Sequence, residues 1–176
     1  MYRGKVFVLL APGFEERDAT TVACTLRRSG LPVALVSLMA GPVRGANGLS
    51  LLPDATLSEA EAEVHQPLAV VMPGGLQGSR HLNADPRVHA LLRRVVSEGG
   101  FVAALDAAYT VLRYAGLLDD LTQGSLSLPE EALLSSSRVV VEGTTIFGRD
   151  SGTAQETALT LVAAIQGAMA LPQMAA

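Results

Sequence analysis

Cysteine and aromatic residues are scarce in this chain of 176 residues, which has one cysteine, no tryptophan and 4% aromatic residues. Because Cys24 is the only cysteine, an internal disulfide, a CxxC pair and a thiolate metal cluster are all excluded. His65, His81 and His89 lack the HxH or HExxH spacing of metal ligands. We therefore expect no metal site and no cofactor. The shortage of aromatic rings also leaves little for a base-stacking platform.

Basic residues and long apolar runs are also few. The chain has 13 Lys and Arg against 17 Asp and Glu, a net charge of -4, and no basic stripe, so nucleic-acid binding is not expected. The first apolar run ends at Pro12-Gly13, too short for a membrane-spanning helix, and no small-residue cleavage site follows it. We expect a soluble, cytoplasmic protein with no membrane partner.

Apolar residues are plentiful, at 49% of the chain, which is enough to bury one good core. Residues 41–53 and 124–137 are turn-rich or weakly patterned, and we expect both to be irregular. Neither is a linker, and the chain has no repeat or low-complexity segment. We therefore predict a single domain over residues 1–176.

Four short apolar runs are typical of strands buried on both faces of a sheet: residues 5–11, 31–38, 68–72 and 101–105. Apolar residues at helical spacing lie between them. One helix is expected to stop at Gly30, and another to begin at Asp85-Pro86 and end at Gly99-Gly100. The alternation predicts an α/β fold with a mostly parallel sheet.

The C-terminal part of the chain adds a hairpin and a helix. Residues 139–141 and 144–147 flank Glu142-Gly143 and predict two paired strands. The last helix is predicted to begin near residues 151–153, and its expected apolar face comprises Ala158, Leu159, Leu161, Val162 and Ile165.

Ligands of an open parallel sheet bind where its strands end. Four segments are predicted to reach such ends: residues 12–18, 73–75, 105–107 and the turn 148–153. We expect them to build one pocket for a small-molecule ligand, in which Gly74 and Gly75 let the backbone approach closely. The amides of Gly75 and Ala107 are candidates for an oxyanion hole.

Asp106 is the most informative residue of this pocket. It closes the apolar run 101–105 and opens a helix-forming run. Such a strand-to-helix elbow holds the nucleophile of many α/β enzymes. The alternative role for a carboxylate here is a helix N-cap, and the residues leave both roles open.

Residues 6–16, 70–75 and 149–154, taken in order and at their separations, resemble the ThiJ/PfpI family. The resemblance covers the chain from Lys5 to about Gly167. It implies the class I glutamine amidotransferase-like fold, a flavodoxin-like three-layer sandwich. Members are commonly homodimers, so we expect a homodimer with contacts from the first helix or from residues 170–176.

The sequence differs from the family pattern at the positions of the catalytic residues. The family elbow reads Ala-x-Cys-Ala-Gly, whereas residues 104–108 read Ala-Leu-Asp-Ala-Ala. Asp18 stands where the family has a Glu that hydrogen-bonds the cysteine, and Leu126 stands where many members have a His. The resemblance therefore implies that thiol-dependent protease, deglycase or glyoxalase activity is absent.

These departures suggest a rebuilt pair of carboxyl groups. Asp106 reaches farther into the pocket than a cysteine, and Asp18 is one methylene shorter than a Glu. If the two touch, they should share a proton, which raises the apparent pKa of one of them. Asp106, at a helix N-terminus, is the expected anion, and Asp18 the proton donor. The alternative for Asp18 is a solvated acid in the first turn of its helix.

Three further side chains are candidates for the pocket. Tyr109 either fills the entrance with its ring or places its hydroxyl over the carboxyl pair. Arg149 is either a substrate contact or the ion-pair partner of Glu15 or Glu16. Thr153 is most simply a cap or first-turn residue.

Two functions remain open. One is a non-catalytic stress-response, chaperone-like or ligand-binding protein, in which Asp106 imitates the cysteine sulfinate of an oxidised family member. The other is a small-molecule enzyme of the isomerase, hydratase or hydrolase type, with Asp106 as base or nucleophile and Asp18 as acid.

Overall fold

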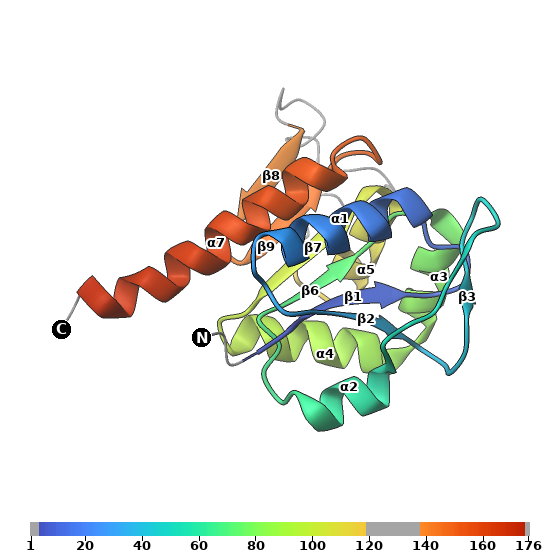
Figure 1. Ribbon diagram of the computed structural model, residues 1–176, viewed down its shortest axis with the longest axis horizontal. Helices are drawn as coiled ribbons and strands as arrows, with labels where there is room; N and C mark the ends of the chain where they lie inside the picture. Colours follow the sequence, from blue (N-terminus) through green and yellow to red (C-terminus); the bar gives the residue numbers. More distant parts are fainter. Residues whose placement is uncertain (1–3, 119–137, 175–176) are drawn as a thin grey trace.

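The computed structural model describes residues 4–118 and 138–174, which form a seven-stranded sheet with helices on both faces (Figure 1). The strand order is β5-β2-β1-β6-β7-β9-β8. Neighbouring strands are parallel except for the antiparallel pair β8 and β9. The predicted α/β fold, with its three layers and mostly parallel sheet, is confirmed.

The central strands coincide closely with the predicted apolar runs: β1 (Val6–Leu10), β2 (Val33–Ser37), β6 (Ala69–Met72) and β7 (Phe101–Leu105). Val8 of β1 is level with Leu35 of β2 and Val71 of β6. All residues of β1 and β6 are buried, as expected for strands covered on both faces. The predicted hairpin is confirmed as β8 (Val139–Glu142) and β9 (Thr145–Gly148).

Two helices, α1 (Glu16–Arg28) and α7 (Ala154–Met174), lie side by side on one face of the sheet (Figure 1). The predicted apolar stripe of α1 is buried within the subunit. On α7 the predicted face is buried except for Leu159, which is 49% exposed. Leu159 follows Ala158 by one residue and so points about 100° away from it around the helix. The C-terminal half of α7 projects beyond the sheet (Figure 1).

Among the described residues, four helices cover the other face: α2 (Leu57–Glu63), α3 (Leu76–Ala84), α4 (Pro86–Ser97) and α5 (Tyr109–Tyr114). α4 begins as predicted, because Asp85 accepts a hydrogen bond from Arg87 N–H (3.0 Å) and Pro86 occupies the first turn. α2 and α3 were not predicted. Thr56 and Glu59 form a capping box at the start of α2.

Residues 41–53 are not wholly irregular, contrary to expectation. β3 (Val43–Arg44) and β4 (Ser50–Leu51) pair as a separate antiparallel ribbon. β5 (Ala55–Thr56) then joins the edge of the main sheet beside β2. Strands of two residues are too short for an alternating pattern to reveal. Residues 124–137, including Leu126, lie outside the described residues.

Candidate functional site

The loops after β1 and β6 meet at the carboxyl ends of these strands. Glu15 N–H donates to Gly74 O (2.8 Å), and Gly78 N–H donates to Gly13 O (3.2 Å). Gly75 has a φ of +101°, and a Cβ at this position would clash with Gly13 O. Only glycine permits this approach. The two loops therefore form one joined unit, as the strand-end pattern predicts.

Asp106 lies in the third loop, where β7 ends and a 3-10 turn (Asp106–Ala108) leads into α5. It is the only non-glycine residue with positive φ, +47°, in the described part of the chain. For a residue with a side chain this conformation costs about 1–2 kcal/mol. The side chain is exposed and makes no capping hydrogen bond to either helix. The sharp bend is present, but the N-cap role is not.

Asp18, in the first turn of α1, is fully buried. Its Oδ2 accepts a hydrogen bond from Gly74 N–H (3.1 Å), and its Oδ1 has no hydrogen-bond partner among the described residues. Burial raises the pKa of Asp18 to about 6. The charges of Glu15 and Asp106 act in the same direction, whereas the Gly74 N–H opposes it. The alternative of a solvated first-turn acid is wrong.

Asp18 and Asp106 both border Gly74. A Cβ on Gly74 would lie 2.6 Å from Asp18 Oδ2 and 3.3 Å from Asp106 Cβ, so glycine is required between the two acids. Within the described residues no hydrogen bond joins the two carboxyl groups, and Asp106 affects the pKa of Asp18 through its charge. The raised pKa of Asp18 has the direction expected of a proton donor, but direct proton sharing between the two acids is not seen among the described residues.

The sequence matches the model of the DJ-1/PfpI family over residues 4–164. The chain belongs to this family. It is 34% identical over 167 residues to protein dj-1beta of Drosophila melanogaster, covering 91% of this chain and 88% of that protein. It is 28% identical over 172 residues to the glutathione-independent glyoxalase DJR-1.2 of Caenorhabditis elegans, with coverage of 91% and 88%.

The fold of this DJ-1/PfpI protein is similar to solved structures of the superfamily. A mutant of a DJ-1 superfamily protein from Salmonella typhimurium superposes with a TM-score of 0.79 at 32% identity, covering 93% of this chain and 91% of that one. The flavodoxin-like arrangement implied by the resemblance is thereby confirmed.

Tyr109 occupies the core of this family member. It is 6% exposed, and its ring meets Phe147 edge to face, with centroids 5.3 Å apart and an interplanar angle of 67°. Both rings belong to the cluster under α3, α4 and α5. The Tyr109 ring therefore packs in the core of the fold and does not lie at an open pocket entrance.

Thr153 and Arg149 belong to the turn before α7. Thr153 is fully buried and directly precedes α7; its hydroxyl donates to Asp150 O (2.5 Å), and its own carbonyl accepts from Thr157 N–H (2.8 Å). Glu15 and Glu16, the expected partners of Arg149, instead accept hydrogen bonds from Asn47. Glu15 and Glu16 thus connect α1 to the β3–β4 ribbon.

Glu16 is a residue near the site that sequence reasoning missed. Its Oε1 accepts from Asn47 N–H (2.8 Å) and Leu49 N–H (3.1 Å). Burial alone would raise the pKa of Glu16, but the hydrogen bond from the Asn47 side-chain amide (2.8 Å), together with these N–H groups, holds it below its usual range. The contacts fix the ribbon to the start of α1. Asn47-Gly48 signals a turn, but nothing local signals a partner 31 residues away.

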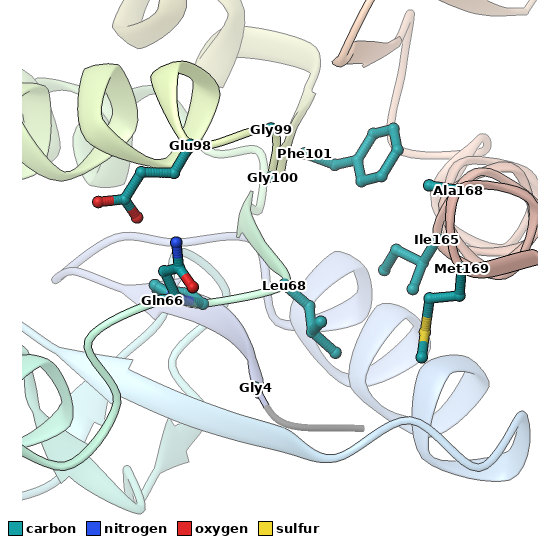
Figure 2. Close-up of a pocket in the computed structure, with 11 residues that line it drawn as sticks. Gly4, Gln66, Leu68, Glu98, Gly99, Gly100, Phe101, Ile165, Ala168 and Met169 are labelled. Atoms are coloured by element: carbon teal, nitrogen blue, oxygen red, sulfur yellow. The ribbon is translucent and has the colours of Figure 1, made fainter. Parts of the chain in front are cut away.

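Three cavities lie away from the two acids. One of about 250 Å³ is at the amino ends of β6 and β7, where Leu68, Phe101 and Met169 line it (Figure 2). A second, of about 560 Å³, lies between α3, α4 and α5. The third, of about 590 Å³, is bordered by Pro12 and His81, whose Nδ1 lies 2.9 Å from Pro12 O. His81 is thus next to the first loop.

The described residues, 4–118 and 138–174, contain neither a metal-binding cluster nor a membrane-spanning helix. No group of three or more His, Cys, Asp or Glu side chains in these residues is arranged to hold a metal ion. No helix found there is both long and apolar enough to cross a membrane. Cys24 is exposed on α1.

Proposed function

We propose that this protein is a DJ-1/PfpI member that works without a thiol, as a stress-response, chaperone-like or ligand-binding protein. The observation that carries the proposal is an exposed carboxylate, Asp106, held at φ +47° in the bend after β7. In the pattern that the sequence resembles, this position holds the nucleophilic cysteine. Cys24 is the only thiol of the chain, and it lies on α1. Thiol-dependent protease, deglycase or glyoxalase chemistry therefore has no nucleophile at the bend.

A carboxylate at this position resembles a cysteine sulfinate in charge and in the placement of its oxygens. Asp106 would therefore give the bend a fixed negative charge that does not depend on oxidation. A protein of this kind presents one constant surface instead of switching with redox conditions. We further propose that it acts in the cytoplasm as a homodimer and binds a small molecule at the strand ends.

Proton transfer is the second candidate, because Asp18 has one buried oxygen without a partner in the described residues and a pKa of about 6. A carboxyl group that titrates near neutral pH is suited to act as a general acid. Asp106, on the other side of Gly74, would act as the base. An isomerase or hydratase needs only these two groups, whereas hydrolysis through an Asp106 ester would need a further base.

Activity measurements on matched variants distinguish the two candidates. The substrates are methylglyoxal, simple esters, an isonitrile and a peptide, tested with wild type, Asp106→Ala and Asp18→Asn. If the protein is a binding protein, none of the three variants converts any of these substrates. Asp106→Ala should then change how well the protein suppresses the aggregation of a client protein. An enzyme loses about 100-fold or more of its turnover in either variant.

The control is Glu98→Gln, which removes an exposed acid at the end of α4, far from the bend. It should match wild type in both assays. Turnover of any substrate that is lost in Asp106→Ala and kept in Glu98→Gln would overturn the non-catalytic proposal. Equal turnover in all variants would point to a contaminant.

A further inference from the structure

The cavity of about 560 Å³ between α3, α4 and α5 has an exposed apolar rim. Leu76 and Tyr114 line it, and they are 58% and 64% exposed. Large apolar side chains beside a concave surface are typical of a ligand site, because a ligand removes them from water. Neither Asp18 nor Asp106 lines this cavity.

Arg80 gives the cavity a single positive charge. It lies on α3, its side chain is exposed, and no ion pair of the described residues includes it. Arg27, Arg87 and Arg94 each pair with a carboxylate. A guanidinium can hold a carboxylate through two parallel N–H bonds. None of the described residues that line the cavity is acidic and could compete for it.

A chain of hydrogen bonds fixes the polar wall of the cavity. His89 Nε2 lies 3.2 Å from Asn83 Oδ1, Asn83 Nδ2 donates to Thr110 Oγ1 (3.2 Å), and Thr110 Oγ1 donates to Ala107 O (2.8 Å). Consistent donation along this chain requires the proton on His89 Nε2. Burial lowers the pKa of His89, and the charge of Arg93 acts in the same direction. The neutral imidazole therefore leaves Arg80 as the cation of the site.

We propose that this cavity binds small apolar monocarboxylates, such as arylacetic acids, with the carboxylate on Arg80 and the apolar body against Leu76 and Tyr114. Among the described lining residues Arg80 is the one cation and none is an acid, which favours a ligand with a single negative charge. The apolar rim favours a ring or short alkyl chain over a sugar. The proposal does not rest on the function proposed for Asp106.

The polar wall also connects the cavity to the bend. Its last acceptor, Ala107 O, belongs to the residue that follows Asp106. A ligand that moves Asn83 or Thr110 would therefore alter the hydrogen bond at the bend. The amide signal of Ala107 is expected to shift when the cavity fills.

Phenylacetate is the probe for this proposal, titrated into the full chain and followed by calorimetry and amide NMR. Arg80→Ala should weaken binding by about tenfold or more, because it removes a charge-assisted hydrogen bond. Tyr114→Ala should weaken it about threefold. The neutral analogue 2-phenylethanol should bind at least about tenfold more weakly than phenylacetate.

The matched control is Arg28→Ala, which removes an exposed arginine from α1 on the opposite face of the sheet. It should bind phenylacetate as wild type does. Equal affinity in Arg80→Ala and Arg28→Ala would overturn the proposal, as would the absence of any phenylacetate binding. These variants keep Asp18 and Asp106, so the result is independent of the activity measurements on those residues.

Discussion

Asp18 is a carboxyl group whose ionised form the fold disfavours. One oxygen is satisfied by Gly74 N–H, but the other is buried without a partner among the described residues. An ionised group in such a place is costly unless it is paired, and protonation relieves the cost. The protonated form can donate a hydrogen bond to a ligand at the strand ends, which the ionised form cannot.

The free energy of unfolding should therefore depend on pH through the titration of Asp18. The pKa of Asp18 is about 6 in the folded state against an ordinary 3.8, so the folded protein holds the proton more tightly than the unfolded chain does. The resulting stabilisation is fully present below about pH 4 and is lost as the pH rises through about 6. Asp18→Asn removes this titration and keeps an acceptor for Gly74 N–H.

Relative to wild type, the free energy of unfolding of Asp18→Asn should therefore rise over this interval by on the order of 2–3 kcal/mol. Urea unfolding at several pH values measures it. Glu98→Gln, at an exposed acid, is the control and should show no such rise. A constant difference between wild type and Asp18→Asn would mean that Asp18 titrates normally in the fold.

The sequence predicted the bend at Asp106 but not the burial of Asp18, and the difference has a physical reason. The bend follows from two adjacent patterns, a buried strand and a helix former, which are both local. The burial of Asp18 depends on Gly74, 56 residues away in sequence. The pairing of Glu16 with Asn47 is non-local in the same way.

At the scale of elements, apolar periodicity predicted the central strands and the helices with apolar stripes, and it failed for α3. Two of the three buried positions of α3 are small, Gly78 and Ser79. A Cβ at Gly78 would lie 2.9 Å from Phe14 Cα, so this helix approaches the first loop by means of small residues. Small residues such as Gly and Ser give no apolar periodicity in the sequence. The close approach of two backbones that they permit cannot be predicted from the sequence either.

The junction between the first loop and α3 should be the least tolerant of glycine replacement. At Gly75 an added Cβ would clash with Gly13 O and would lie 2.8 Å from Glu15 N, at a φ of +101°. Gly99 also has positive φ, +80°, but nothing lies within 4 Å of its added Cβ. The two positions therefore separate backbone strain from steric conflict.

Gly99→Ala should lower the free energy of unfolding by about 1 kcal/mol, because only the strained φ remains. Gly75→Ala should lower it by about 3 kcal/mol or more, because the obstructing atoms are backbone. Chemical denaturation of both variants at one pH checks the difference. Equal losses would show that the loops separate easily and that the junction is not a fixed part of the site.

At the scale of the whole molecule, α7 offers apolar side chains that the subunit does not cover. Leu159 is 49% and Met169 41% exposed, and the C-terminal half of the helix extends beyond the sheet (Figure 1). The apolar stripe of α1, by contrast, is buried against the sheet. If the protein is a homodimer, these side chains of α7 are the better candidates for the contact.

A double variant, Leu159→Glu with Met169→Glu, should therefore weaken self-association, because it places two charges where the dimer would bury apolar surface. We expect the dissociation constant of the dimer to rise at least about tenfold in sedimentation velocity. Gln77→Glu adds a charge to an exposed polar position of α3, on the opposite face of the sheet, and serves as the control. A dimer that survives the double variant unchanged would place the contact on another surface, and a monomeric wild type would reject the dimer itself.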